Sequence, residues 1–298
     1  MRKDFFLPAS LAGALVVMAV YATTGSKGSS AELEVAPARC EVTGGLSAIS
    51  ELGEASGLTA SRRNPQLLWA HNDSGDPTIY ALGVDGTVRG RLRMAGASVG
   101  DWEAITTGPC PGGSCLYVGD IGDNDTSRST ITIYRTPEPL ATDAATAPVS
   151  AFEGAYPDGA QDAEAMFVVD GSLYVITKGE KSPIRIYRFP ALQSGPALKL
   201  VRVATLTDEG ARKGDRITDA AVSPDRVWVG LRTNARLLFF KTAALTSGNP
   251  GTPLAFDIKG LKEPQGEGLA WGDGNMLYLA GEAQRGGTFG RVSCNLPS

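Results

Sequence analysis

A short segment consisting of an acidic residue followed by small and aliphatic residues recurs five times along this chain. With one acidic residue per copy as the equivalent position, successive copies are 49, 61, 55 and 48 residues apart. Such spacings are typical of the four-stranded blades of a β-propeller. The equivalent residues are Glu54, Glu103, Glu164, Asp219 and Glu267.

Each copy is followed by short apolar runs that predict a second and a third strand, separated by Gly, Pro, Asn and Asp turns. The fifth unit ends with Thr288–Cys294 as its third strand, so its outer strand must come from elsewhere, and Arg39–Val42 can supply it. We therefore predict an all-β propeller of five blades, closed by N- and C-terminal strands in one blade. The alternatives are a sixth blade hidden between Glu103 and Glu164, and a β-sandwich.

The four cysteines favour two disulfides in an oxidising compartment. Cys110 and Cys115 enclose Pro-Gly-Gly-Ser, a tight-turn sequence, and are predicted to staple a hairpin. Cys40 is then left with Cys294, and a bridge between these distant residues agrees with a closed ring. Two free or intermolecular thiols are the alternative.

The N-terminal residues have the pattern of an export signal, with Arg2 and Lys3 before an apolar run from Phe5 to Ala22. We predict a signal peptide over residues 1–22, a flexible Ser/Gly-rich tether over 23–38 and the propeller domain over 39–298. An uncleaved membrane anchor is the alternative, and it would be the chain's contact with a membrane. The expected location is secreted or in the cell envelope.

Composition excludes one class of partner. The formal net charge is −4 and no Lys/Arg cluster is present, so nucleic-acid binding is not expected. A hydrophobic content of 42% in 298 residues is sufficient for a substantial core. We expect a monomer.

The first strand of each propeller blade lines the central channel, so the five repeated acids are expected to converge there. Like charges at short range raise carboxyl pKa values or require a cation, and Ca²⁺ prefers oxygen ligands. The predicted metal ligands are Glu103, Glu164, Glu267 and Asp123, the last from an acidic, glycine-rich loop. The alternative is that each acid caps turns or pairs with backbone N–H groups of a neighbouring blade.

A second polar set follows the second strands and is expected to share one end of the propeller. Lys178 and Arg232 beside carboxylates would suit an anionic ligand, although ion pairs between blades explain them equally well. Together with the loop residue His71, this set comprises Asp73, Asp120, Lys178, Arg232 and Glu282.

The chain lacks the usual catalytic signatures. His71 is its single histidine, which excludes a multi-histidine zinc site and leaves no other base for a serine triad. Neither a G-x-S-x-G elbow nor a phosphate-binding loop is present.

The repeated acid-small-aliphatic segments, with His71–Gly75 and Tyr117–Asn124, resemble uncharacterised secreted bacterial propellers that are distantly similar to phytase-like and TolB-like propellers. The resemblance implies Ca²⁺ and phosphoester hydrolysis at the channel carboxylates. A phytase catalytic set does not align residue by residue.

Three functions follow from these observations. The first is a secreted binding module with an acidic, cation-binding channel mouth for a small anionic molecule or an exported partner. The second is a Ca²⁺-dependent hydrolase of phosphoesters or lactones. The third is a cell-envelope domain that binds other proteins.

Overall fold

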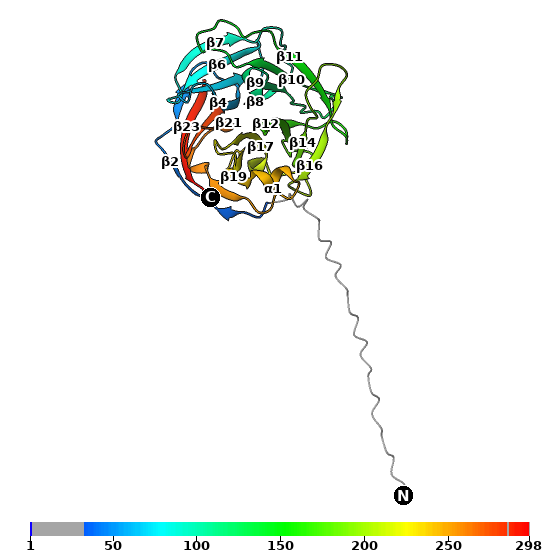
Figure 1. The fold of residues 1–298 in the computed structure, drawn as a ribbon. Coiled ribbons are helices and arrows are strands. Elements are labelled where there is room, and N and C mark those ends of the chain that lie inside the picture. Colours follow the sequence, from blue (N-terminus) through cyan, green and yellow to red (C-terminus); the bar gives the residue numbers. More distant parts are fainter. Residues whose placement is uncertain (2–32, 285, 298) are drawn as a thin grey trace.

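The structure is a computed structural model that describes residue 1 and residues 33–284 and 286–297. Its strands form five antiparallel blades around a central axis, with inner strands at the centre and outer strands at the periphery (Figure 1). The predicted five-bladed propeller is confirmed, and the interval between Glu103 and Glu164 holds no sixth blade. The predicted signal peptide lies outside the described residues, apart from residue 1.

The first three blades follow one another along the chain. The first contains β4 (Ala55–Ala60), β5 (Leu67–Asn72), β6 (Thr78–Gly83) and β7 (Val88–Arg93). The second contains β8 (Trp102–Cys110), β9 (Gly113–Asp120), β10 (Ile131–Pro137) and β11 (Ser150–Ala155), with β15 (Leu198–Lys199) at its edge. The third contains β12 (Ala163–Val169), β13 (Ser172–Thr177), β14 (Arg185–Arg188) and β16 (Val201–Thr205).

The last two blades also use strands from the N-terminal part of the chain. The fourth contains β17 (Ile217–Val222), β18 (Trp228–Thr233), β19 (Arg236–Lys241) and β20 (Leu254–Asp257), with β1 (Ala36–Pro37) at its edge. The fifth contains β21 (Gln265–Trp271), β22 (Met276–Glu282), β23 (Gly287–Asn295) and β2 (Arg39–Val42), and β3 (Ser47–Ile49) also pairs with β23.

Helical structure among the described residues is short: α1 (Thr242–Thr246) and 3-10 turns at Lys213–Asp215 and Lys259–Leu261. None of the helices in these residues is sufficiently long and apolar to cross a membrane.

The ring closes as the sequence predicts, because β2 pairs with β23 and places Cys40 opposite Cys294. These two cysteines form one disulfide, and Cys110 and Cys115 form the other across the β8–β9 hairpin. Ala36 and Pro37, which lie within the predicted tether, pair with β20 at the edge of the fourth blade.

The hydrophobic core lies between neighbouring blades. Each blade turns one sheet face to the next, as Phe167 and Tyr174 of the third blade do toward Val229 and Leu238 of the fourth. The inner strand β12 is buried along its whole length. The other inner strands are buried over most of their length, so the inner strands have both faces covered.

Every inner strand carries a β-bulge at the same place, near its start. A bulge adds one residue to a strand and redirects a side chain. The five extra residues are Ser56, Glu103, Glu164, Thr218 and Glu267. The predicted equivalence was therefore wrong in two blades, where Ser56 replaces Glu54 and Thr218 replaces Asp219.

Candidate functional site

Carboxyl groups gather at the end of the axis where the inner strands begin. The second strand of each blade runs antiparallel to the first and therefore ends there. We call the resulting cluster the acidic mouth. It consists of Glu54, Asp73, Asp101, Glu103, Asp162, Glu164, Glu267 and Glu282.

Three glutamates at bulge positions form the floor of the acidic mouth. Glu103, Glu164 and Glu267 are 7%, 3% and 6% exposed. The Ser56 hydroxyl donates a hydrogen bond to Glu103 Oε2 over 2.6 Å, which shows that bulge residues of neighbouring blades point toward each other. Thr218, at the bulge of the fourth blade, is also buried, and its hydroxyl has no hydrogen-bond partner among the described residues.

Lys178 supplies a positive charge to this floor. Its Nζ pairs with Glu164 Oε1 and lies 3.8 Å from Asp162 Oδ2. Burial alone would lower the pKa of Lys178, but the neighbouring carboxylates outweigh it and raise this pKa. The ammonium group therefore stays charged and occupies the place for which the sequence predicted a metal ion.

The floor carboxyls retain protons more readily than ordinary glutamates. Burial and the charge of Glu164 raise the pKa of Glu103 well above its usual range. Burial likewise raises the pKa of Glu164, against the effect of Lys178. Burial raises the pKa of Glu267 to about 7. The charge of the floor therefore changes near neutral pH.

The rim of the acidic mouth is more accessible. Glu54 is exposed, whereas Asp73, Asp101 and Glu282 are partly buried. Burial first, and then repulsion between carboxylates, raises the pKa values of the last three. The rim therefore concentrates negative charge that a cation would relieve.

Asp219 does not belong to the acidic mouth. It is fully buried, and its Oδ2 accepts backbone N–H bonds from Leu58 (3.2 Å) and Leu269 (2.7 Å), on the inner strands of two other blades. Burial raises its pKa well above the usual range, although these N–H groups oppose the shift. Asp219 thus ties inner strands together across the axis, as the backbone-pairing alternative predicted.

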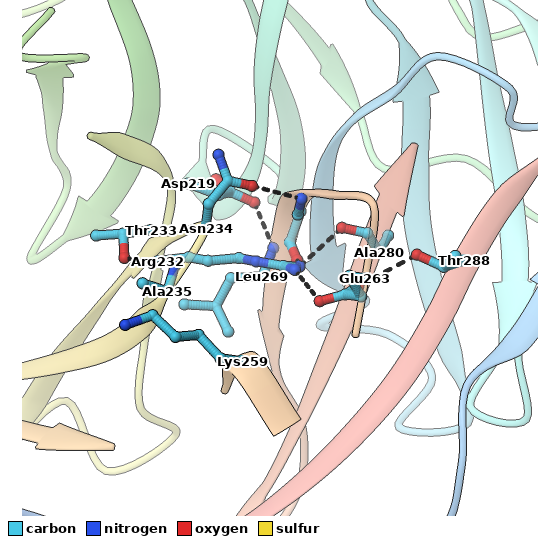
Figure 2. Close-up of polar contacts among 12 residues, drawn as sticks. Asp219, Arg232, Thr233, Asn234, Ala235, Lys259, Glu263, Leu269, Ala280 and Thr288 are labelled. Carbon is cyan, nitrogen blue, oxygen red and sulfur yellow. Dashed lines mark hydrogen bonds and ion pairs between the residues drawn. The ribbon is translucent and has the colours of Figure 1, made fainter. Parts of the chain in front are cut away.

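Arg232 is a structural anchor and not a ligand residue (Figure 2). Its side chain is fully buried, and Nη1 donates to the carbonyl oxygens of Gly268 (2.6 Å) and Ala280 (2.7 Å) while Nη2 pairs with Glu263. A side chain at Gly266 would occupy the guanidinium position. Arg232 therefore joins the fourth and fifth blades.

His71 is a core residue. It is fully buried, packs edge-on against Trp102 at 5.7 Å, and directs Nδ1 toward the carbonyl oxygen of Asn72. Burial lowers its pKa to about 4, so it is neutral at physiological pH. It does not reach the acidic mouth as a solvent-accessible base.

Of the four predicted calcium ligands, Glu103, Glu164 and Glu267 share the floor of the acidic mouth, but Asp123 does not join them. Asp123 folds back on its own loop, where its two carboxylate oxygens accept the N–H groups of Ser127 and Arg128 at 2.9 Å. Asp120 is also committed, since it accepts the Gly100 N–H and pairs with Arg128. No group of three His, Cys, Asp or Glu among the described residues is arranged to hold a metal ion. The predicted set of Glu103, Glu164, Glu267 and Asp123 therefore does not fit Ca²⁺.

The sequence did contain a signal for the members of the acidic mouth that were missed. Asp101 and Asp162 each stand two residues before a bulge glutamate, in Asp-x-Glu segments. Because a bulge turns an extra residue toward the axis, both acids of such a segment reach the same end. Ser56 and Thr218 are uncharged and gave no such signal.

Comparisons with known proteins support the fold. No family model and no curated protein matches the chain. A PQQ-bound aldose sugar dehydrogenase from Streptomyces coelicolor aligns with 14% identity and a TM-score of 0.50, over 88% of this chain and 100% of that one. A glucose dehydrogenase aligns with 10% identity and a TM-score of 0.51, over 85% and 100%. The gluconolactonase XC5397 from Xanthomonas campestris aligns with 13% identity and a TM-score of 0.47, over 90% and 99%. The chain is thus similar in fold to the two dehydrogenases, whose TM-scores reach 0.50.

Proposed function

We propose that this protein is an extracytoplasmic binding module whose acidic mouth takes a ligand with an organic ammonium group, on a small molecule or an exported partner. The observation that carries this proposal is the set of rim carboxyls Asp73, Asp101 and Glu282, whose pKa values are raised by burial and by each other. A cation placed among them would favour their ionised form and gain free energy. The two disulfides support the extracytoplasmic location.

The internal ion pair supports an ammonium ligand over an anionic one. Lys178 shows that carboxylates of this cluster accommodate an ammonium group, through Glu164 and Asp162. An anion would need free cationic donors, but Lys178 is paired and Arg232 is buried on backbone carbonyls. The sequence predicted a small anionic ligand or an exported partner at a cation-binding mouth, whereas the contacts of Lys178 and Arg232 favour a cationic ligand.

Thermal unfolding and calorimetric titration test this proposal with 1,4-diaminobutane, Ca²⁺ and inorganic phosphate as probes. We expect saturable binding of the diamine and a higher melting temperature. Asp101→Asn and Glu282→Gln should each weaken binding about fivefold, the equivalent of one lost charge contact of about 1 kcal/mol. Asp273→Asn, an exposed carboxyl at the other end of the axis, is the matched control and should not change it.

Failure of the diamine to bind, or equal binding by all three variants, would refute the proposal. Saturable binding of phosphate in place of the diamine would point to an anionic ligand and would refute it as well.

A hydrolase is the second candidate, because a carboxyl with a pKa of about 7 suits proton transfer at neutral pH. Glu267 is such a group on the floor of the acidic mouth. The phytase-like resemblance suggests phosphoesters as substrates, and lactones are the other class that the hydrolase hypothesis included. Turnover of a phosphomonoester or a simple lactone, with and without added Ca²⁺, checks this candidate. Loss of that turnover in Glu267→Gln with unchanged diamine binding would separate it from the binding role.

A further inference from the structure

A cavity of about 800 Å³ opens on the axis at the end opposite the acidic mouth. All five blades contribute to it, through the ends of their inner strands and the hairpins that follow. We call this cavity the basal pocket and define it by Thr59, Thr106, Val168, Ala221 and Trp271. Its volume lies in the range of pockets that enclose drug-sized ligands.

The basal pocket has two unlike walls. Thr59 on β4 and Thr106 on β8 place hydroxyl-bearing side chains on neighbouring blades. The inner strands of the other three blades contribute Val168, Ala221 and Trp271, which are apolar. A ligand that matches this pocket has hydroxyl groups on one side and an apolar surface on the other.

The two threonine hydroxyls are free to bind. The side chains are largely buried, with Thr59 9% and Thr106 7% exposed. Neither hydroxyl makes a hydrogen bond within the described residues. Both can be reached by solvent, unlike the unpaired hydroxyl of Thr218, which is completely buried. Free polar groups in an otherwise buried wall are what a pocket uses to fix the orientation of a ligand.

Charge is confined to the rim of the basal pocket. Arg226 and Asp170 form an exposed ion pair at 2.9 Å, and Arg62 and Asp273 are exposed. Two cations and two anions balance at this rim. No charged side chain of the described residues lines the interior, so a charged ligand would lose its hydration without compensation.

The basal pocket is separate from the acidic mouth. Midway along the axis, Asp219 bridges to the N–H groups of Leu58 and Leu269. The inner strands are also in close approach here, because a Cβ on Gly268 would lie 3.0 Å from the Leu58 nitrogen. A molecule bound in the basal pocket therefore does not reach the acidic mouth.

From these observations we infer that the basal pocket is a second binding site, for a neutral small molecule with hydroxyl groups on one side and an apolar body on the other. The Thr59 and Thr106 hydroxyls bind its hydroxyl groups, and Val168, Ala221 and Trp271 cover its apolar side. This inference is independent of the role of the acidic mouth.

Calorimetric titration of the disulfide-intact protein tests the inference. Hexyl β-D-glucopyranoside is the neutral probe, and hexyl sulfate and hexylammonium are charged probes with the same apolar length. We expect saturable binding of one glucoside per chain and at least tenfold weaker binding of the sulfate. Combining Thr59→Val with Thr106→Val removes both hydroxyls at constant shape and should weaken glucoside binding about tenfold or more.

Two further variants keep the test decisive. Ala221→Trp fills the pocket and should abolish glucoside binding even if the double valine variant fails to fold. Thr132→Val, on the second blade but outside the pocket, is the matched control and should bind as the parent does. Lack of saturable binding, or unchanged binding in Ala221→Trp, would overturn the inference. Loss of glucoside binding in Asp101→Asn would do so too, because the probe would then occupy the acidic mouth.

Discussion

The two ends of the propeller axis are built from the same five strands and have opposite character. At the acidic mouth, bulge residues turn Glu103, Glu164 and Glu267 toward one another, with Lys178 beside them. At the basal pocket, the same strands contribute threonine, valine, alanine and tryptophan to a cavity whose charged residues lie at the rim. Asp219 separates the two ends.

This difference shows that a repeat architecture carries function in the positions where its copies diverge. The bulge is common to all five blades, but only three of the five bulge residues are acidic. The backbone repeat supplies a ring of equivalent positions, and the residue type at each position decides the chemistry. Buried carboxyl groups are therefore concentrated at one end of the axis.

The largest effect is expected from Lys178→Met, which removes the cation from the floor of the acidic mouth. Glu164 is then a buried carboxyl without its partner. Breaking a buried ion pair from one side typically costs about 3–5 kcal/mol. We expect a loss of this size in the free energy of unfolding at pH 8, measured by urea denaturation.

The double variant Lys178→Met with Glu164→Gln is the control for that prediction. It removes both charges and should recover most of the lost stability. If Lys178→Met were as stable as the parent at pH 8, the ion pair would not hold the acidic mouth together, and the contrast between the two ends would fail.

The second effect is a pH dependence that belongs to Glu267. Its pKa rises from 4.5 to about 7 on folding, so between these values the native state holds a proton that the unfolded state has released. Stability due to this group therefore falls as the pH rises from 4.5 to 7, by about 3 kcal/mol in total. Glu267→Gln should be more stable than the parent at pH 8 and similar to it at pH 4.5.

His71 opposes this trend and must be separated from it. Its pKa falls to about 4 on folding, so its contribution to stability is lost as the pH drops from 6.5 toward 4. Both proteins contain His71, so its effect cancels in the difference between parent and Glu267→Gln. Glu153→Gln, at an exposed carboxyl on β11, should leave the pH profile of the parent unchanged. A Glu267→Gln profile parallel to that of the parent would contradict the assignment.

The sequence was a good guide to the architecture, because the architecture rests on repetition. Blade spacing, aromatic second strands and the ring closure at Cys40 and Cys294 all follow from residue patterns. The site was harder to predict, because its geometry rests on the bulges. Because of the extra residue, the positions equivalent to the bulge glutamates are Ser56 and Thr218. Neither residue is charged, so a search for repeated acids does not find them.

Side-chain direction was the other obstacle. Arg232 and Lys178 occupy comparable places after a second-strand aromatic, yet Arg232 is fully buried on backbone carbonyls while Lys178 reaches the acidic mouth. The difference depends on the space left by Gly266 in the next blade. A contact between blades is not visible in the local sequence of either.

A third prediction concerns the close packing of the inner strands between the acidic mouth and the basal pocket. A Cβ at Gly57 would lie 2.7 Å from His71 Nε2 and 2.9 Å from the Ile105 nitrogen. Gly57→Ala should therefore lower the free energy of unfolding by about 1–3 kcal/mol, the usual range for overpacking. The matched control is Gly260→Ala, where nothing lies within 4 Å of the added carbon. Equal stability of the two variants in urea would mean that the inner strands are free to move apart.

The smallest effect is expected at the basal pocket. Ala221 packs in the hydrophobic core with Trp271 and also borders the basal pocket. We expect the added carbons of Ala221→Leu to enter the cavity, so the free energy of unfolding should change by no more than about 0.5 kcal/mol. Urea denaturation beside Gly57→Ala provides the comparison. A decrease in the free energy of unfolding as large as that of Gly57→Ala would show that side chains fill the basal pocket. The proposed difference between the two ends would then be wrong.

The pairing of β2 with β23 also affects the order in which the newly synthesised chain can fold. Cys40 and Cys294 are 254 residues apart, so the strand that emerges early waits for a partner that emerges near the end of synthesis. Before Cys294 is synthesised, we expect the Cys40 thiol to encounter Cys110 and Cys115, which precede Cys294 in the chain. An early hairpin disulfide between those two protects the chain, because it withdraws the wrong partners before the right one arrives. Contacts of such long range also form slowly, so we expect the fifth blade to be the last to assemble.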